Sequence, residues 1–501
     1  MIQAFAPRMP RGGSWVWPAI VGIAFACPSS EAQAPKPAAP VPPPKPAAPV
    51  PTPKPADAGA EPADKPDDTA TNSEIYIDPN AKKTLAIFSP LVASGPPIRI
   101  GNPPDDRTRV QNMAARIENI DRAFLRRYID HFAVELSRRD NLNAILNPPP
   151  TAKPGSAQSR ALEVAIDALN KPMVDGRAQN NAEFLTEYSR TLFESSLPKL
   201  LDNNFLSRID AMIVLGTAGS PAPAALDLYI AQIKKADQVF PVKEWAARGI
   251  TNAAQRGRVD LDAARTIQAA EALVGLLDGD PKLPWFVQMR ALETLGSIRL
   301  ATNNNSRAKV DAASVAMRFL TDREARPAVR AWAAWALGMM RVSSQVAPYN
   351  FELLGYEIGE CAVDLGRRIV EEYDENPASF DKEMDEAAHL ASLLIFQVYP
   401  SLVGQDNVRE SGLLNSTHPN LGPARPFLTK VDARVKAIAR EAYELLRAGG
   451  AGHKARRDSL DRNVADLKQL LAQNLPKSRR LTPGGPEFTP SSDQVARAPR
   501  R

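Results

Sequence analysis

The chain has 501 residues, of which 44% are hydrophobic and 24% charged, and its formal net charge is +5. It contains two cysteines and four histidines, and one cysteine lies in the N-terminal region, so little material remains for a disulfide framework or a zinc site. We therefore expect a fold held by its core alone, without metal or cofactor, and a folded part of ~370 residues is ample for such a core.

The first 34 residues predict export. Two arginines precede an apolar run of about twelve residues from Trp15 to Ala26, which is shorter than the ~20 residues that span a bilayer. A basic start, a short apolar run and a small-residue exit are typical of a secretory signal peptide. Cleavage after Ala34 and cleavage after Ala26 are both open. The second would place Cys27 at the new N-terminus as a lipidation site, and an uncleaved anchor is a third alternative.

Residues 35–55 predict a stiff arm. They contain eleven prolines and three lysines in 21 positions, and the string KPAAPVP occurs twice. Proline at this density fixes φ and removes backbone donors, which predicts polyproline II. At ~3.1 Å per residue the arm spans roughly 65 Å. It resembles the Pro-Lys spacers of periplasm-spanning bacterial proteins such as the TonB class. A passive spacer and a ligand for a Pro-binding partner domain are both open.

From Asp106 to about Pro476 the hydrophobic residues recur three and four positions apart, which predicts helix after helix. Residues 404–426 are rich in glycine and proline and predict a long loop. Short apolar stretches before Asp106 predict an extended lead-in. The clearest individual helices are expected at 224–233, 263–277, 312–320, 353–373, 430–446 and 458–475.

A repeated helix carries the second signal. Residues 327–338 read PAVRAWAAWALG, and their apolar spacing returns 42 residues earlier at 287–296 and about 80 residues before that at 208–216. A period of ~40–47 residues with two helices per unit is the signature of HEAT or armadillo arrays. The segment from Val329 to Gly338 resembles the first helix of HEAT-like repeats. That resemblance implies an α–α superhelix whose concave surface holds a partner, so we predict an all-α, HEAT-like solenoid preceded by a disordered Pro-rich arm.

The basic excess lies at the C-terminus, where lysine and arginine residues follow the last predicted helix. Such a tail contacts anionic surfaces or only solubilises the chain. Aromatic residues are not interleaved with these charges, so we expect no nucleic-acid partner. The chain thus divides into a signal peptide (1–34), a Pro/Lys-rich disordered linker (35–73), an extended lead-in (74–105), a helical repeat domain (106–476) and a basic disordered tail (477–501).

The sequence offers no paired catalytic groups. Glu386 and His389 lie on one helical face but lack the second Glu-x-x-His pair of di-iron bundles. Ser196 and Lys199 match a Ser-x-x-Lys motif, yet Pro198 would break its helix and the companion motifs of penicillin-binding enzymes are missing. The eight acidic residues between 371 and 386 do not follow a calcium loop. We expect no catalytic residue and no metal site.

Tryptophans near the starts of successive repeat units are the better candidates for binding. Exposed on one face, they would anchor a partner; otherwise they fill spaces between helix pairs, which we favour for Trp332 because its neighbours are alanines. The candidate binding residues are Trp245, Trp285, Trp335, Arg479, Arg480, Arg500 and Arg501, and Cys27 is the candidate lipidation site.

These patterns favour a non-enzymatic scaffold that binds an unknown protein partner in the bacterial cell envelope, in the periplasm or outside the cell. Two alternatives stay open. One is an exported all-helical enzyme that acts on glycans through a carboxylate such as Glu383 or Glu386. The other is a binder of cell wall or anionic lipid that acts through the basic tail.

Overall fold

The structure is a computed structural model, and its described part is all-helical, with sixteen α-helices and one two-stranded hairpin. The predicted signal peptide, the linker and nearly all of the lead-in lie outside the described residues. The structure describes residues 104–138, 141–142, 161–256, 261–280, 282–305, 308–344, 348–375, 377, 380, 384–406, 408–448, 450 and 452–491.

The N-terminal helices pack around one another ahead of the predicted repeats. Asn181 begins α5: its side chain accepts a hydrogen bond from the Phe184 amide and also donates to the Met113 and Ala114 carbonyls. One residue thus caps a helix and ties it to the end of another. These elements are α1 (Pro104–Ala114), α2 (Arg122–Ser137), α4 (Ala161–Ala178), α5 (Ala182–Glu194) and the 3-10 turn η1 (Leu197–Asp202).

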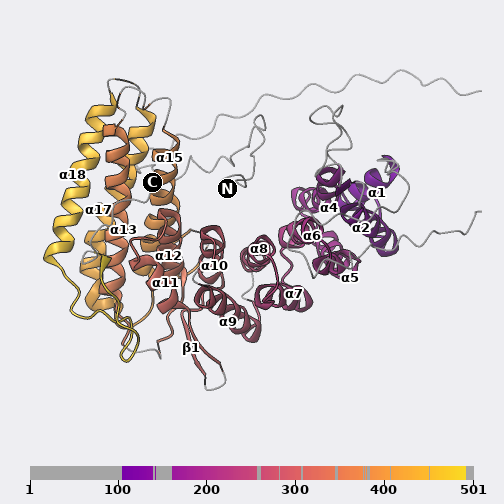
Figure 1. The fold of residues 1–501 in the computed structure, drawn as a ribbon, viewed down its shortest axis with the longest axis horizontal. Helices are drawn as coiled ribbons and strands as arrows, with labels where there is room; N and C mark the ends of the chain where they lie inside the picture. Colours follow the sequence, from indigo (N-terminus) through magenta and orange to yellow (C-terminus); the bar gives the residue numbers. More distant parts are fainter. Residues whose placement is uncertain are drawn as a thin grey trace, which may run out of the picture. The chain divides into compact units, whose positions relative to one another are not determined.

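The middle of the chain forms two rows of helices (Figure 1). In the first row each helix packs against the next, and the members are α6 (Phe205–Ala218), α8 (Phe240–Arg256), α10 (Trp285–Ile298) and α12 (Pro327–Met339). Each second-row helix packs against the first-row helix that follows it, and the members are α7 (Pro223–Lys234), α9 (Ala263–Gly279) and α11 (Ala312–Thr321). The bounds of α7, α9 and α11 agree closely with the helices predicted from spacing.

Small residues let the first-row helices approach one another. A Cβ added to Gly216 on α6 would lie 2.5 Å from the Trp245 carbonyl oxygen on α8, and one added to Gly296 on α10 would lie 2.5 Å from the Trp335 ring on α12. Neither space admits a side chain. The glycine that recurs at the end of the sequence repeat is therefore a close-packing residue between neighbouring helices.

Side-chain caps and prolines set where the middle helices begin. Asn204, Asp262 and Asp311 each accept a hydrogen bond from a backbone amide three residues on, at the starts of α6, α9 and α11. Pro327 stands in the first turn of α12, where its missing N–H costs no helical hydrogen bond. Between α10 and α11 the chain makes a short antiparallel hairpin of β1 (Thr302–Asn305) and β2 (Ala308–Asp311), with Thr302 opposite Asp311.

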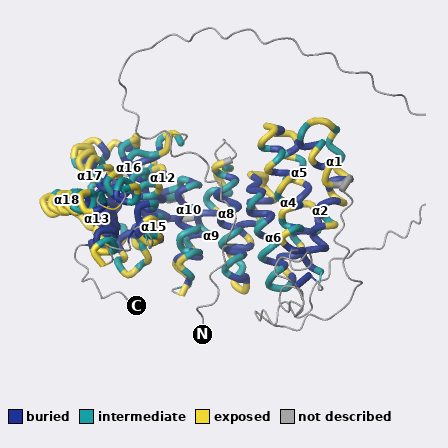
Figure 2. The backbone as a smooth tube through the Cα atoms, turned by 90° about the horizontal axis from the view of Figure 1, so that it is seen from above, coloured by how far each residue is buried: buried dark blue, intermediate teal, exposed yellow. Residues whose placement is uncertain are grey.

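Three long helices close the C-terminal side: α13 (Phe351–Glu375), α17 (Leu421–Arg447) and α18 (Gly452–Gln473) contact one another. A continuous segment packs against α12, α13 and α17 and consists of α15 (Asp385–Leu393), the π-helical turn η2 (Leu394–Val398) and α16 (Tyr399–Val403); the short turn η3 (Leu413–Asn415) follows. Figure 2 shows α18 largely exposed, whereas α8 and α10 are mostly buried or intermediate.

Helix α17 begins inside the segment that was predicted to be a loop. It starts at Leu421, so the irregular part after α16 is shorter than residues 404–426. Pro423 falls in its first turn, where a missing N–H removes no helical hydrogen bond, and Pro426 is accommodated one turn later. The prolines that indicated a loop therefore belong to a helix start.

The structure also differs from the predicted disordered tail over residues 477–491, which we call the C-terminal strap. The Asn350 side chain donates to the Ser478 and Arg480 carbonyls at 3.0 and 3.1 Å, and its backbone amide donates to the Leu481 carbonyl at 2.9 Å. Leu481 and Phe488 are buried. These two buried side chains and the hydrogen bonds from Asn350 hold the strap against the helical body, although its positive charge had indicated a free tail. Residues 492–501 lie outside the described residues.

One helix in the described part of the chain, Asp385–Val403, is long and apolar enough to cross a membrane by length and composition. It is the α15–η2–α16 segment, and it packs against α12, α13 and α17. Its apolar face includes Leu390, Leu394 and Leu402, which are buried in the core.

Candidate binding groove at the helix-pair turns

The first-row helices begin at turns that bring Trp285 and Arg326 together. Trp285 is the first residue of α10, after Pro284, and Arg326 is the residue before Pro327 at the start of α12. The Arg326 guanidinium carbon lies 5.2 Å from the centroid of the Trp285 ring, within cation–π distance. Trp285 keeps 40% of its surface exposed, and its indole N–H donates no hydrogen bond to the described part of the chain.

A hollow of about 460 Å³ opens beside this pair, and we call it the Trp285 hollow. Arg318 lines this hollow, and its guanidinium pairs with Asp278 at 2.8 Å and donates to the Leu277 carbonyl at 3.2 Å. These contacts fix the wall between α9 and α11. The lining residues are Leu277, Asp278, Asp280, Leu283, Trp285, Gln288, Arg318, Phe319, Asp322, Glu324, Ala325 and Arg326.

A second, more apolar hollow of about 780 Å³ lies at the preceding turn, between α7, α8 and α9, and we call it the Phe205 hollow. Its apolar walls include Phe205, Ile233 and Phe240. Asp280 lines both hollows, so the two adjoin. We call the two hollows together the turn groove.

Lys243 is the most deeply placed charge of the groove. It lines the Phe205 hollow and is only 8% exposed. Burial lowers the pKa of Lys243, while the carboxylates of Asp280 and Asp237 act in the opposite direction. The amine and these two carboxylates thus form a polar spot within apolar walls, which is the usual arrangement of a site that orients a ligand.

Trp245 belongs to the packing between first-row helices. It is partly buried, the Arg248 guanidinium lies 4.6 Å from its ring centroid, and its carbonyl faces Gly216. Next to it, Arg290 pairs with Glu244 at 3.4 Å and also with Glu293. Burial raises the pKa of Glu293, which Arg290 and Arg248 oppose. The cluster links α8 to α10.

Trp335 fills the space over Gly296 and is only 4% exposed, so it does not present a surface for a partner. Trp332 is partly buried and meets Trp335 edge to face, with ring centroids 5.2 Å apart. Among the predicted tryptophans, only Trp285 is both exposed and beside a hollow.

Arg479 and Arg480 belong to the C-terminal strap. Arg480 donates to the Gly485 carbonyl at 2.8 Å and pairs with Glu487 at 3.4 Å, and the Arg479 carbonyl accepts from the Phe488 amide. These contacts shape the strap itself. Cys27, Arg500 and Arg501 lie outside the described residues.

The strap ends in a buried polar network on α13. Ser491 donates to Glu357 from both its amide and its hydroxyl, and Glu357 is fully buried. Burial raises the pKa of Glu357 to about 7. One turn along, Glu360 pairs with Arg323 at 3.1 Å, and Asp364 pairs with the buried Arg330 at 2.8 Å. None of these residues lines a hollow described in this section, and their contacts hold the strap and α12 against α13.

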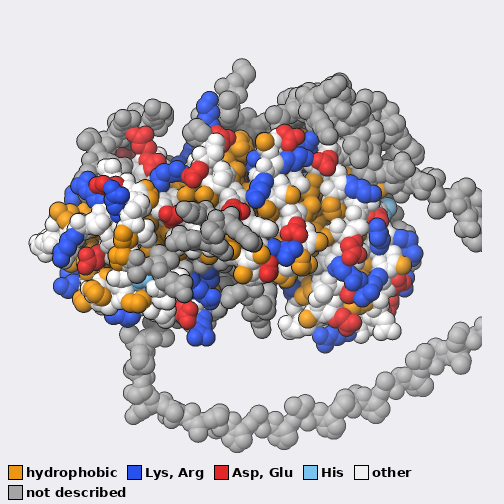
Figure 3. Space-filling view, turned by 90° about the horizontal axis from the view of Figure 1, so that it is seen from below, with side chains coloured by type: hydrophobic (Ala, Val, Ile, Leu, Met, Phe, Trp, Pro, Cys, Tyr) orange, Lys and Arg blue, Asp and Glu red, His pale blue; other side chains and the backbone are white. Residues whose placement is uncertain are grey.

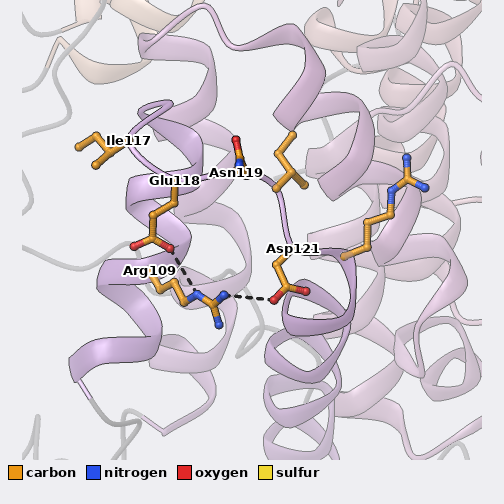
Figure 4. Close-up of a pocket in the computed structure, with 7 residues that line it drawn as sticks. Arg109, Ile117, Glu118, Asn119 and Asp121 are labelled. Carbon is orange, nitrogen blue, oxygen red and sulfur yellow. Dashed lines mark hydrogen bonds and ion pairs between the residues drawn. The ribbon is translucent and has the colours of Figure 1, made fainter.

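A third hollow lies at the corner between α1 and α2 (Figure 4). Arg109 from α1 donates to Glu118 at 3.3 Å and to Asp121 at 3.1 Å, and its guanidinium covers the Phe124 ring. Asp121 also caps α2, and its hydrogen bond from the Phe124 amide is the main cause of its lowered pKa. The charged groups of this hollow pair with one another and hold α1 against the start of α2. Nearly all of the residues that line the hollow come from the loop between these helices.

The weak catalytic motifs do not assemble into a site. Glu386 and His389 are exposed on α15 and line none of the three hollows, and Glu383 lies outside the described residues. Ser196 precedes the 3-10 turn η1, and Lys199 is exposed. Cys361 is buried in α13, and burial raises its pKa to about 11, so it is not an activated thiol.

Within the described residues, no group of three or more His, Cys, Asp or Glu side chains is placed to hold a metal ion. Figure 3 shows a face on which Lys and Arg alternate with Asp and Glu among hydrophobic side chains. On the described part of this face the charges are mixed and form no broad field of one sign.

The comparisons with known proteins add no family. No family model, no curated protein and no solved structure matches this chain.

Sequence reasoning named Trp285 as a candidate but did not name the charged residues that line the two hollows. Arg326, Asp280 and Lys243 come from three separate turns, and no local motif joins them. The only available signal was position: each lies within a few residues of a helix start or end, as Trp285 does.

Proposed function

We propose that this chain is a non-catalytic binding protein of HEAT-like helical-repeat type, and that an extended segment of a partner protein lies in its turn groove. The two-row packing of α6 to α12 supports the repeat assignment. Successive helix pairs in such arrays present equivalent turns along one edge, which suits an extended ligand.

The observation that carries the proposal is the exposed Trp285, which lines one of two hollows that share Asp280. Tryptophan and arginine are the residues that most often dominate binding energy at interfaces, and here Arg326 holds the indole ring from one side. The indole N–H, which donates no hydrogen bond to the described part of the chain, offers a directional hydrogen bond, and Leu277, Leu283 and Phe319 line the same hollow. A partner segment would bury the ring and bond to its N–H.

The proposal places the protein in the bacterial cell envelope or outside the cell, with the Pro/Lys arm as the spacer ahead of the helical body. The support is the N-terminal sequence pattern alone. The mass of the mature N-terminus tests this part. A chain beginning at Pro35 indicates export and cleavage, a lipid-bearing Cys27 indicates anchoring, and an intact Met1 in the cytoplasmic fraction contradicts the proposal.

Site-specific photo-crosslinking tests the groove. A photoreactive phenylalanine analogue at Ala325, which lines the Trp285 hollow, should capture one defined partner in the producing cells. Trp285→Ala in the same chain should abolish that product. The matched control is Phe396→Ala, because Phe396 is also exposed, at 47%, but lies on η2 away from the groove. Equal capture by all three chains would contradict the proposal.

A further inference from the structure

Lys243 carries a buried amine that the fold leaves without a partner. The residue is 8% exposed and lies in the first turn of α8, and its side chain makes no hydrogen bond and no ion pair with the described part of the chain. The carboxylates of Asp237 and Asp280 act on it from beyond ion-pair distance. Because a sealed and unpaired charge is very costly, the amine is best accommodated facing the Phe205 hollow, which the residue lines.

The walls of the Phe205 hollow suit an apolar molecule. Its volume of about 780 Å³ lies within the ~300–1,000 Å³ that is usual for small-molecule sites. Ile233, Val239 and Leu276 are buried wall residues, and Phe205 and Phe240 are partly buried beside them. Such walls favour an aliphatic ligand that brings one polar group to the amine.

The charges around the hollow indicate that this polar group is neutral. Two amines and three carboxylates line the hollow, and they belong to Lys234, Lys243, Asp237, Glu271 and Asp280. A ligand carboxylate or phosphate would lie close to the three carboxylates, and a ligand ammonium would lie close to the buried amine; like charges at short range repel. A carbonyl avoids both repulsions, and it is the neutral group that reacts with an amine.

The surroundings of Lys243 favour the neutral, nucleophilic form of its amine. Side chains on a helix lean toward its N-terminus, so this one lies over the first turn of α8, where the backbone dipoles disfavour a positive charge. Burial lowers the pKa of Lys243, although the carboxylates of Asp280 and Asp237 oppose this effect. A desolvated lysine in an apolar pocket is an established kind of nucleophile toward carbonyl compounds.

We infer that Lys243 forms an imine with an aliphatic aldehyde held in the Phe205 hollow. The amine nitrogen attacks the carbonyl carbon, a C–N bond forms, and one amine proton moves to the oxygen to give a carbinolamine. The hydroxyl then leaves with the second amine proton as water, and a C=N bond remains. Asp237 and Asp280 are the nearby carboxylates that can carry these protons. The step consumes no oxidant or reductant, and water reverses it.

This inference goes beyond the partner segment proposed for the turn groove and does not depend on it. Trp285, the anchor of that proposal, is not among the residues that line the Phe205 hollow. The two proposals therefore concern different side chains and can be tested on the same purified chain.

Reductive trapping on the purified full chain tests the inference. Octanal is added together with sodium cyanoborohydride, which reduces an imine to a stable secondary amine, and mass spectrometry locates the octyl groups. We expect Lys243 to be alkylated about tenfold faster than the exposed Lys234, because the hollow holds the aldehyde beside the amine. Glyoxylate, an aldehyde that carries a carboxylate, should show no preference for Lys243.

A variant that fills the hollow provides the matched comparison. Gly275 lines the hollow, and a Cβ added to it meets nothing within 4 Å, so Gly275→Leu should fold and occupy the space that octanal needs. Alkylation of Lys243 should then fall to the rate of Lys234. The control is Gly422→Leu, because a Cβ at Gly422 also meets nothing within 4 Å and the residue does not line the hollow. It should keep the preference for Lys243.

Three results would overturn the inference. Alkylation of Lys243 no faster than that of Lys234 would show that the site does not capture the aldehyde. A preference that persists in Gly275→Leu would show that the hollow does not hold it, and an equal preference with glyoxylate would show that the walls do not select the ligand. Trp285→Ala should leave the alkylation of Lys243 unchanged while it abolishes partner capture from Ala325, so this inference and the proposed function can fail separately.

Discussion

The first-row array from α6 to α12 and the C-terminal bundle of α13, α17 and α18 reach stability by different means. In the array, alanine and glycine bring each helix close to its neighbour, as at Gly296 and Trp335. In the bundle, long helices contact one another and the end of the strap, and Ser491 contacts Glu357 across 134 positions of sequence. The array depends on near neighbours, whereas the bundle depends on contacts that only the complete chain can make.

This difference bears on where a binding site can form. In the array, polar side chains at the turns such as Arg318 and Asp278 remain open to solvent, whereas Lys243 is only 8% exposed. In the bundle, the comparable polar groups face one another and are buried. A ligand can therefore reach Trp285 without disturbing the core, whereas a change in the Glu357 network alters the fold itself.

The largest expected effect is where the array meets the bundle, at Arg330→Met, because Arg330 of α12 pairs with Asp364 of α13. Arg330 is only 1% exposed and pairs with Asp364 at 2.8 Å. Removing one partner of a buried ion pair is strongly destabilising, because the other charge stays buried. Arg367 and Arg368 still contact Asp364 in the variant, so we expect a loss of folding free energy at the low end of the usual range, about 3 kcal/mol. Urea unfolding followed by hydrogen exchange measures it: α13 amides should lose protection and α6 amides should not.

The matched control for that change is Arg409→Met, because the Arg409 side chain is 88% exposed. It should leave the unfolding midpoint unchanged. Equal loss of protection in α6 and α13 would contradict the division between array and bundle.

A change in folding stability of similar size is expected as the pH rises, and it comes from Glu357. Its pKa is raised from 4.5 to about 7 by burial, so the folded chain holds this proton more tightly than the unfolded chain does. Stability from this group is therefore present below pH ~4.5 and is lost as the pH rises toward 7, on the order of 3 kcal/mol. Glu357→Gln should remove this loss. The stabilities of the variant and the parent chain should diverge between pH 5 and 7, and parallel curves would contradict the account.

A smaller effect is expected in the array, from one substitution made at two glycines. Gly296→Ala places a Cβ against the Trp335 ring and should cost about 1–2 kcal/mol. Gly275→Ala on α9 meets nothing within 4 Å and should gain about 0.5–1 kcal/mol, as alanine does within a helix. Thermal unfolding distinguishes them by the sign of the shift, and a gain at both positions would refute close packing at Gly296.

Particular residues show how far the sequence could predict this fold. The helices α7, α9 and α11 were predicted within one or two residues because their apolar spacing is regular. The start of α17 was missed because Pro423 indicates a loop unless its place in a first turn is known. The strap was missed because Leu481 and Phe488 are only two apolar residues in a segment with many charges. Its buried partner Glu357 is also distant in sequence, so no local pattern joins the two.

The candidate site divides in the same way. Trp285 could be singled out because it begins a predicted repeat unit, but spacing cannot tell an exposed ring from a buried one. Trp335 was also predicted to lie near the start of a unit, but it lies inside α12 and is buried, since Gly296 on the neighbouring helix leaves space for it. The roles of Arg326 and Lys243 depend on which turns adjoin, and that follows from packing alone.

The smallest effect on stability should come from Trp285→Ala, at less than about 0.5 kcal/mol, because the ring is exposed and lies outside the core. The same variant is the most direct test of the account, through its affinity for the partner captured from Ala325. The account predicts about tenfold weaker binding with unchanged thermal unfolding, and no change for Phe396→Ala. Unchanged affinity in Trp285→Ala would contradict the turn groove as the binding site.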